Sequence, residues 1–166
     1  MSLTAQAQPA FPPARRRASP HVLSPISRAP GWQTRAMDGD RNVLGGPLEP
    51  CGTDPVTGFF RDGSCTTGPQ DLGSHTVCAV VTAEFLHHQE RLGNDLVTAR
   101  PDLAFPGLRP GDRWCVVAVR WLEAHQAGAA APVVLASTHE RALETVPLEV
   151  LRQHAVDVPA DPGSLT

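Results

Sequence analysis

The 166-residue sequence contains no lysine and no tyrosine, and its single isoleucine is Ile26. All fourteen basic residues are therefore arginines, a bias that we attribute to GC-rich codon usage rather than to an arginine-based binding surface. The longest apolar runs, T-V-C-A-V-V and W-C-V-V-A-V, are far shorter than the about eighteen residues that a membrane span needs. These absences predict a soluble protein with no membrane partner.

Positive charge is scarce in the part of the chain that is expected to fold. Residues 1–37 carry five arginines and no acid (+5), whereas residues 38–166 carry nine arginines and seventeen acidic residues (−8). Neutralising phosphates needs clustered cations, and no basic stripe with interleaved aromatic residues is present. The sequence therefore predicts no nucleic-acid partner and leaves a small molecule as the expected one.

Composition divides the chain into three parts. Residues 1–36 are rich in Pro, Ala, Ser and Arg, which predicts a disordered tail. Three explanations of this tail are open. It is an organellar transit peptide, a basic interaction arm, or the product of a mis-called start, with true translation beginning at Met37. Residues 37–156 predict a single domain, and residues 157–166, with two prolines and a glycine, a loose C-terminus.

Short apolar runs bounded by turn residues predict most of the regular structure. Strands are expected over 57–61, 76–81, 113–120 and 132–136, with a further short one over 143–146. Helices are expected over 83–92, 121–127 and 147–154, with Thr82 as the N-cap of the first and Gly93 as its end. We expect a loop-rich α+β domain in two layers, with helices on one face of a small mixed sheet.

Three of the four cysteines lie between residues 51 and 78, in a segment rich in Gly, Pro and Thr that shows no apolar period for most of its length. Cys78 and Cys115 each occupy the middle of an apolar run, which favours core packing. Cys51 and Cys65 lie in polar loops, which favours a functional role for them over core packing. Because no secretory apolar segment is recognisable, we expect a cytoplasmic protein, in which clustered thiols indicate metal or redox chemistry.

Several chemistries remain open for the loop cysteines. A thiolate of Cys65 or Cys51 is one, activated by His75 and oriented by Asp71. His75 cannot act with Cys78 on one regular strand, because residues three apart point to opposite faces.

The second chemistry is a zinc site drawn from Cys51, Cys65, His75 and Cys78, although the spacings lack close C-x2-C pairs. The third is a reversible Cys51–Cys65 disulfide, which closes a loop of about fifteen residues and contributes about 3 kcal/mol. In the last alternative, these cysteines are merely buried loop thiols. No cofactor is expected outside the zinc alternative.

Two loops are expected to meet in a polar pocket around the loop cysteines, Asp71 and His75. The first covers residues 42–75. The second covers residues 93–112, an unusually long connection of a kind that is often functional. Arg61, Asn94 and Asp95 are the candidate substrate-binding residues, since a planar guanidinium matches a carboxylate or phosphate. We therefore expect a small thiol-dependent enzyme or ligand-binding protein, or alternatively a non-catalytic zinc-binding or structural module.

Six motifs resemble a bacterial family known only as domain of unknown function 2237. They are N-V-L-G-G-P-L-E-P-C (42–51), T-G-F-F-R-D-G-S-C (57–65), D-L-G-S-H-T-V-C-A-V-V-T (71–82), G-N-D-L (93–96), F-P-G-L-R-P-G-D-R-W-C (105–115) and T-H-E-R-A-L (138–143). The resemblance covers about residues 42–155. It implies a two-layer α+β fold and a cytoplasmic protein but no activity. His88 departs from the aromatic residue expected there.

Overall fold

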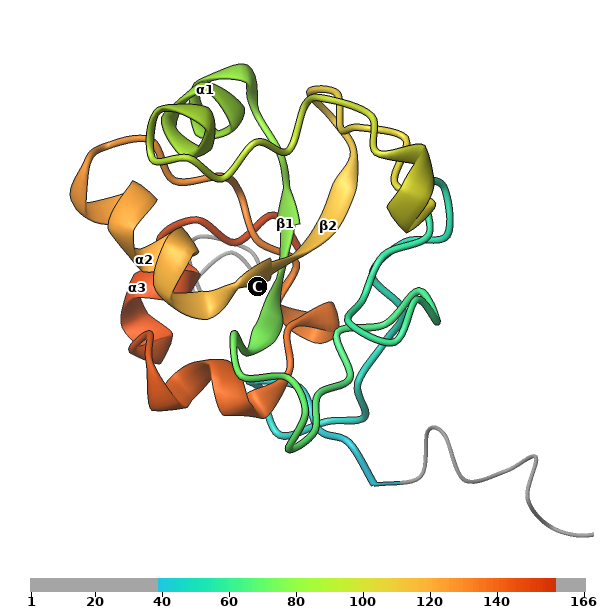
Figure 1. Ribbon diagram of the computed structural model, residues 1–166. Coiled ribbons are helices and arrows are strands. Elements are labelled where there is room, and N and C mark those ends of the chain that lie inside the picture. Colours follow the sequence, from blue (N-terminus) through green and yellow to red (C-terminus); the bar gives the residue numbers. More distant parts are fainter. Residues whose placement is uncertain (1–38, 158–166) are drawn as a thin grey trace, which may run out of the picture. The chain divides into compact units, whose positions relative to one another are not determined.

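The computed structural model describes residues 39–157, so the expected tail over 1–36 and the end of the chain after residue 157 lie outside the described part. Its sheet consists of two antiparallel strands, β1 (His75–Val80) and β2 (Arg113–Val117) (Figure 1). The register places Cys78 opposite Cys115. The α+β class is confirmed, with a sheet that is antiparallel and smaller than expected.

The strand expected over 132–136 is reduced to a single bridging residue, Val133. It pairs antiparallel with Ala79 and parallel with Ala155. Directly after it the chain turns into the 3₁₀ helix η2 (Leu135–Ser137). The carboxylate of Asp157 accepts hydrogen bonds of 2.8 Å from the backbone N–H groups of residues 135 and 136, which satisfies donors that a ladder would otherwise use.

Helix α1 (Ala83–Arg91) forms where the capping residues predict it. The Thr82 hydroxyl accepts a 3.1 Å hydrogen bond from the backbone N–H of Phe85, as expected of an N-cap. Gly93 then adopts a φ of 80°, a conformation that favours glycine. Near the C-terminal end of the described residues, α3 (Leu148–Arg152) follows Pro147. It is shorter than the helix expected over 147–154.

Helix α2 (Ala118–Gln126) begins three residues before the expected start, so β2 is correspondingly shorter. The run V-V-A-V reads as a continuous strand, but Ala118, Trp121 and Ala124 are buried at helical spacing, whereas Val119 is 46% exposed. The indole Nε1–H of Trp121 donates a 2.9 Å hydrogen bond to the carbonyl of Ala131. This contact with a later segment is not visible in the local sequence.

The strands expected over 57–61 and 143–146 do not form. In the first segment, Gly58 and Arg61 both have positive φ values, 95° and 56°, which are incompatible with an extended strand. The second is replaced by the 3₁₀ helix η3 (Glu140–Glu144). A further 3₁₀ helix, η1 (Pro101–Leu103), lies in the long loop before β2. Within residues 39–157, no helix has the length and apolar character needed to span a membrane.

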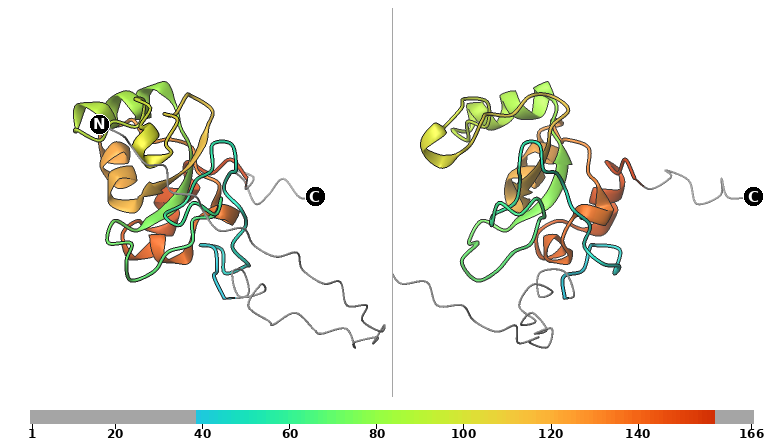
Figure 2. Two further views of the ribbon diagram at one scale, coloured as in Figure 1. Left: turned by 45° about the vertical axis from the view of Figure 1, so that its right-hand side comes forward. Right: turned by 90° about the vertical axis from the view of Figure 1, so that its right-hand side faces the viewer.

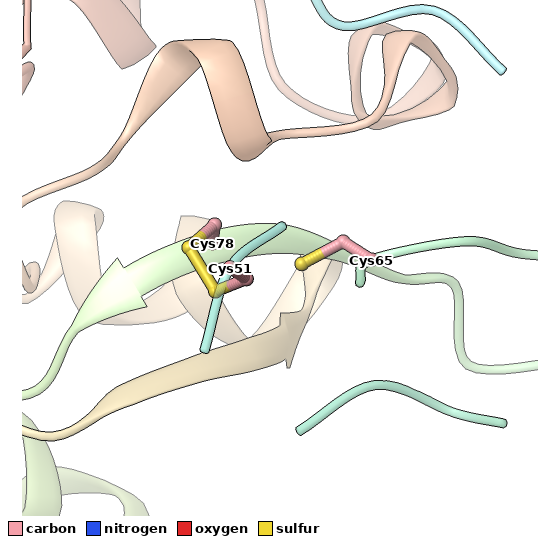
Figure 3. A group of neighbouring side chains, drawn as sticks. All are labelled: Cys51, Cys65 and Cys78. Carbon is pink, nitrogen blue, oxygen red and sulfur yellow. A yellow bond between two sulfur atoms is a disulfide. The ribbon is translucent and has the colours of Figure 1, made fainter. Parts of the chain in front are cut away.

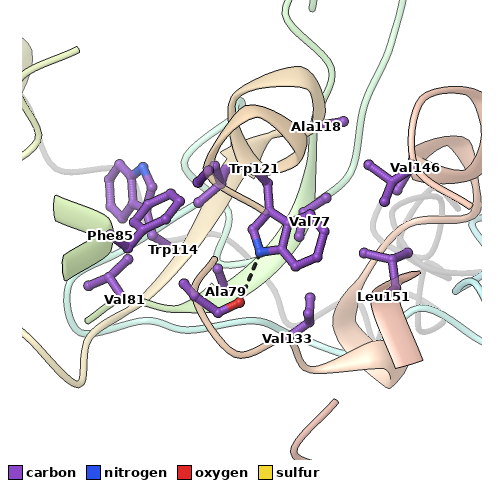
Figure 4. Packing of buried hydrophobic residues seen from close by; sticks show 14 of the residues in the cluster. Val77, Ala79, Val81, Phe85, Trp114, Ala118, Trp121, Val133, Val146 and Leu151 are labelled. Atoms are coloured by element: carbon purple, nitrogen blue, oxygen red, sulfur yellow. Dashed lines mark hydrogen bonds between the residues drawn. The ribbon is translucent and has the colours of Figure 1, made fainter. Parts of the chain in front are cut away.

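Two clusters of buried side chains lie on opposite faces of the strands, because successive strand residues point to opposite sides. The main core contains Val77 and Ala79 of β1 together with Trp121 and residues of all three α-helices (Figure 4). Cys78 and Cys115 face the other way, into a small cluster with the remaining two cysteines and Val134. In Figures 1 and 2, the loops of residues 40–70 lie on the side of the strands away from α2.

Candidate functional site

All four cysteines are disulfide-bonded, Cys51 to Cys78 and Cys65 to Cys115. The prediction of a Cys51–Cys65 pair is wrong. Each loop cysteine is instead joined to a strand cysteine. The prediction that Cys78 and Cys115 occupy buried strand positions is confirmed, but they are not simple core thiols. The pairing follows from the register, because the two strand cysteines lie opposite each other and each receives one cysteine from the loop packed over them.

The two disulfides lie side by side in the small cluster. The Sγ atoms of Cys51, Cys65 and Cys78 all lie within 4.8 Å of one another (Figure 3). The four cysteine residues are at most 1% exposed. No free thiol is therefore present in the described structure, and a thiolate nucleophile at Cys51 or Cys65 requires prior reduction.

Asp71 and His75 form a close pair just before and at the start of β1. The Nδ1 atom of His75 lies 2.6 Å from Oδ1 of Asp71. The other carboxylate oxygen accepts hydrogen bonds from the backbone N–H of His75 at 2.8 Å and from the Thr67 hydroxyl at 3.0 Å. The Asp71 side chain is fully buried, whereas the His75 side chain is 34% exposed. The Asp71 carboxylate thus fixes the His75 ring at Nδ1 and leaves the other edge of the ring accessible.

The electrostatics of Asp71 determine which nitrogen of His75 carries the proton. Burial acts to raise the pKa of Asp71, but the hydrogen bonds from the ring and backbone of His75 and from Thr67 outweigh it, and the pKa lies below its usual value of 3.8. An ionised carboxylate only accepts hydrogen bonds, so Nδ1 of His75 must be the donor. In the neutral ring, the lone pair is then on Nε2.

The turn before β1 is shaped to hold this ring. A Cβ atom on Gly73 would lie 3.3 Å from Cε1 of His75 and 3.2 Å from Cγ2 of Val117, which is closer than side chains usually approach. Ser74 has a φ of 57°, an uncommon conformation for a residue other than glycine. The ring of Phe59 packs against His75 with a centroid separation of 5.7 Å.

His75 opens into a cavity of about 400 Å³. Residues from both long loops line it, together with Trp114 and Cys115 of β2. Its polar lining comes from Arg61, His75, Asp95 and Arg100, and its aromatic lining from Phe59, Phe105 and Trp114. A hollow of about 620 Å³ adjoins it at Arg61 and Phe105, but Arg61 is the only charged residue in its lining. The smaller cavity therefore has the more varied set of charged and polar side chains in its lining.

Arg61 and Arg100 bring positive charge to the cavity. The guanidinium carbon of Arg61 lies 4.8 Å from the centroid of the Trp114 ring, a cation–π distance, and Arg61 has no carboxylate partner within residues 39–157. Arg100 lies 3.7 Å from the exposed carboxylate of Asp102. Both guanidinium groups retain free donors for an anion.

The other expected substrate-binding residues differ in their placement. Asp95 lines the cavity, but its Oδ1 accepts hydrogen bonds of 2.9 Å from the backbone N–H groups of Val97 and Thr98. Hydrogen bonds from Thr98 and Val97 lower the pKa of Asp95, so it is held as an anion. Asn94 is not in the lining, and its amide donates a 2.8 Å hydrogen bond to Gln89.

Cys51 and Cys65 do not line the cavity either. The cysteine in its lining is Cys115. Four of the charged and aromatic lining residues, Arg100, Phe59, Phe105 and Trp114, are not predicted as site residues from the sequence. Arg100 lies in the 93–112 loop that was expected to be functional, but nothing distinguishes it locally from any exposed arginine.

The chain matches a known protein family. A family model described as "Uncharacterized protein conserved in bacteria (DUF2237)" matches residues 41–155. No curated protein matches the chain in sequence. The matched range begins before the first cysteine and ends at Ala155, so it includes both disulfides, the Asp71–His75 pair and the cavity.

Proposed function

The chain belongs to the DUF2237 family of bacterial proteins, and we propose that it binds a small anionic molecule in the cavity beside His75 and that His75 acts on this molecule as a general base. The proposal rests on one observation above all, the 2.6 Å contact between His75 and the buried Asp71. It refines the expectation of an enzyme or ligand-binding protein with a Cys/His/Asp pocket, and it assigns the reactive role to the imidazole.

The pair has the parts that general base catalysis needs. A buried carboxylate accepts a hydrogen bond from Nδ1–H and fixes the tautomer, and the lone pair of Nε2 is then available to take a proton. The same carboxylate stabilises the imidazolium that forms. The partly exposed ring borders the cavity, so a bound molecule can reach it.

An anionic group on the ligand is inferred from the arginines. Arg61 and Arg100 both line the cavity, and a guanidinium group binds a carboxylate or phosphate through two parallel hydrogen bonds. The Phe59 and Trp114 rings supply apolar surface for the rest of the ligand. A cavity of about 400 Å³ falls within the usual range for small-molecule sites.

The disulfides support this site mechanically. They tether residues 51 and 65, which bracket the segment carrying Phe59 and Arg61, to β1 and β2. The cavity wall is thereby joined to the strand that carries His75. In this oxidised form, a sulfur nucleophile plays no part in the proposed reaction.

Binding is tested by titrating the oxidised protein with inorganic phosphate, acetate and benzoate while recording NMR spectra. We expect saturable shifts at His75 and Arg61, with affinity lowered about tenfold by Arg61→Gln or Arg100→Gln, as expected for the loss of a charge-assisted pair. The matched control Arg152→Gln removes an exposed arginine of α3 and should leave affinity unchanged. Shifts that do not saturate, or that are the same in all variants, would exclude an anion site.

Base catalysis is tested separately with p-nitrophenyl acetate and p-nitrophenyl phosphate as probes. We expect a protein-dependent rate that disappears in His75→Gln and is retained in His87→Gln, because His87 is 69% exposed on α1 and distant in sequence from the pair. Equal rates in the two variants would show that His75 is not the base.

A further inference from the structure

We propose that the reduced protein binds one zinc ion through the thiolates of Cys51, Cys65, Cys78 and Cys115, so that the zinc site and the two disulfides are alternative states of one cluster. The inference concerns the opposite face of the sheet from the main core and does not depend on the proposed function. From the sequence, His75 is expected as the fourth ligand of a zinc site. In the site proposed here, the fourth ligand is Cys115.

The sulfur atoms are already close to the arrangement that zinc requires. In a tetrahedral site with Zn–S bonds of about 2.3 Å, neighbouring sulfurs lie about 3.8 Å apart. Three sulfurs drawn from two different disulfides lie within 4.8 Å of one another, and Cys115 is bonded to one of these three. The Cα atoms of the bonded pairs are 5.7 Å and 5.4 Å apart. The sulfur of Cys115 lies outside this group of three, so a four-sulfur site requires its side chain to move after the disulfide to Cys65 is broken.

The backbone elements that present the cysteines are held independently of the sulfurs. Cys78 and Cys115 lie opposite each other in the β1–β2 ladder. The loop that carries Cys51 is held by hydrogen bonds of its own, such as those from the backbone N–H groups of Cys51 and Gly52 to the carbonyl of Gly63, at 2.8 Å and 3.1 Å. The Thr57 hydroxyl also accepts a 2.7 Å hydrogen bond from the backbone N–H of Cys115. None of these hydrogen bonds involves a sulfur atom.

The surroundings favour a metal once the thiols are free. The four residues are at most 1% exposed, and Val134 and the partly buried Val80 complete their apolar cluster. Such a buried, apolar place separates four unbonded thiols from water, and zinc converts them into bonded thiolates. His75 is not among these ligands, because the group of potential metal-ligating side chains found within residues 39–157 consists of cysteines alone.

The chemical step is balanced by a thiol or phosphine reductant. Each disulfide takes up two electrons and two protons, so a dithiol reductant is oxidised to its own disulfide while two cysteine thiols form. After both disulfides are reduced, Zn²⁺ binds four sulfurs and releases four protons. Zinc therefore restores the tether between the loop and the strands that reduction removes.

The test uses the full chain reduced anaerobically with a phosphine, freed of the reductant and titrated with Zn²⁺ and Co²⁺. Native mass spectrometry should show one zinc per reduced chain and none in the oxidised protein. The cobalt form should show the near-ultraviolet thiolate-to-cobalt band and the visible band of a tetrahedral site. The double variant Cys65→Ser/Cys115→Ser should bind zinc at least about 100-fold more weakly, because two of four ligands are lost.

A matched control separates the cysteines from a histidine pair that packs against Trp121. His125 and His154 lie 3.0 Å apart, and His154→Asn should leave zinc binding unchanged. A reduced protein that unfolds without zinc and regains its circular dichroism with zinc supports the proposal. A reduced protein that binds no zinc, folded or unfolded, overturns it, as does equal binding by the double cysteine variant. The ligand and rate experiments above use oxidised protein, so their outcome is separate.

Discussion

The Nδ1 atom of His75 lies 2.6 Å from Oδ1 of Asp71, a carboxylate whose side chain is fully buried. Asp71 accepts three hydrogen bonds, two from His75 and one from Thr67. A buried anion with this many donors stabilises the turn before β1 as well as the ring. Both roles can be separated by measuring stability and rate on the same variant.

Asp71→Asn should lower the free energy of unfolding by about 1–3 kcal/mol at pH 7, since it removes a buried charge from its three donors. The folded-state pKa of Asp71 lies below the usual 3.8. The stabilisation is therefore present above about pH 4 and is lost as the pH falls through the folded-state pKa. Urea unfolding at pH 7, 5 and 3 should show the difference between wild type and variant shrinking only at the lowest pH. Glu149→Gln, on the surface of α3, is the control, and a difference independent of pH would contradict the argument.

The two disulfides should contribute similar stability. They span 27 and 50 residues of sequence, for which the chain-entropy model gives about 3.6 and about 4 kcal/mol. The double variants Cys51→Ala/Cys78→Ala and Cys65→Ala/Cys115→Ala should each lose roughly this free energy of unfolding in guanidinium titrations. Thiol titration checks that the remaining disulfide is intact. A loss below about 1 kcal/mol in either variant would show that the hydrogen bonds of the loop suffice without the tether.

Local signals in the sequence account for the parts of the fold that depend on local structure. Thr82 and Gly93 mark the ends of α1 because capping needs only neighbouring backbone groups. The continuous apolar, β-branched run around Cys78 correctly places it in a buried strand. The start of α2 was not predictable, because V-V-A-V suits a strand, and the burial of Trp121 against the carbonyl of Ala131 accompanies a helix there instead.

The candidate site also combines features that the local sequence predicts with features that depend on distant parts of the chain. Asp71 and His75 are four residues apart, so their association follows from the loop that contains them, and the sequence indicated it. The disulfide partners of Cys51 and Cys65 depend on strand register and on how a loop folds over the sheet, which no spacing encodes. Arg61 adopts a φ of 56° with no local sign of it, and its guanidinium reaches Trp114, fifty-three positions along the chain.

Gly58 should be intolerant of any side chain. It has a φ of 95°, and a Cβ atom there would collide with the backbone carbonyl of Ser64, in the segment that forms the cavity wall. Gly58→Ala should therefore cost at least about 3 kcal/mol in thermal or urea unfolding. Gly45 is the matched control, because its φ is 84° but open space surrounds it. Gly45→Ala should cost only about 1 kcal/mol, and equal costs at the two sites would show that the collision is relieved by movement of the loop.

The histidine pair beneath Trp121 should make stability depend on pH near neutrality. Nδ1 of His125 lies 3.0 Å from Nε2 of His154, a hydrogen bond that needs one proton between the two atoms. Burial, and then the nearby His125, lower the pKa of His154 below its usual 6.5. As the pH falls, His154 therefore takes up a proton in the unfolded chain before it does so in the folded chain. The stabilisation is complete above about pH 6.5 and is lost as the pH falls through the folded-state pKa.

Thermal unfolding between pH 5 and 8 checks this expectation. The midpoint of the wild type should fall more steeply below pH 6.5 than that of His154→Gln, in which the titrating group is absent. His87→Gln removes an exposed histidine of α1 and should leave the wild-type slope unchanged. Parallel slopes for the wild type and His154→Gln would mean that another group produces the pH dependence.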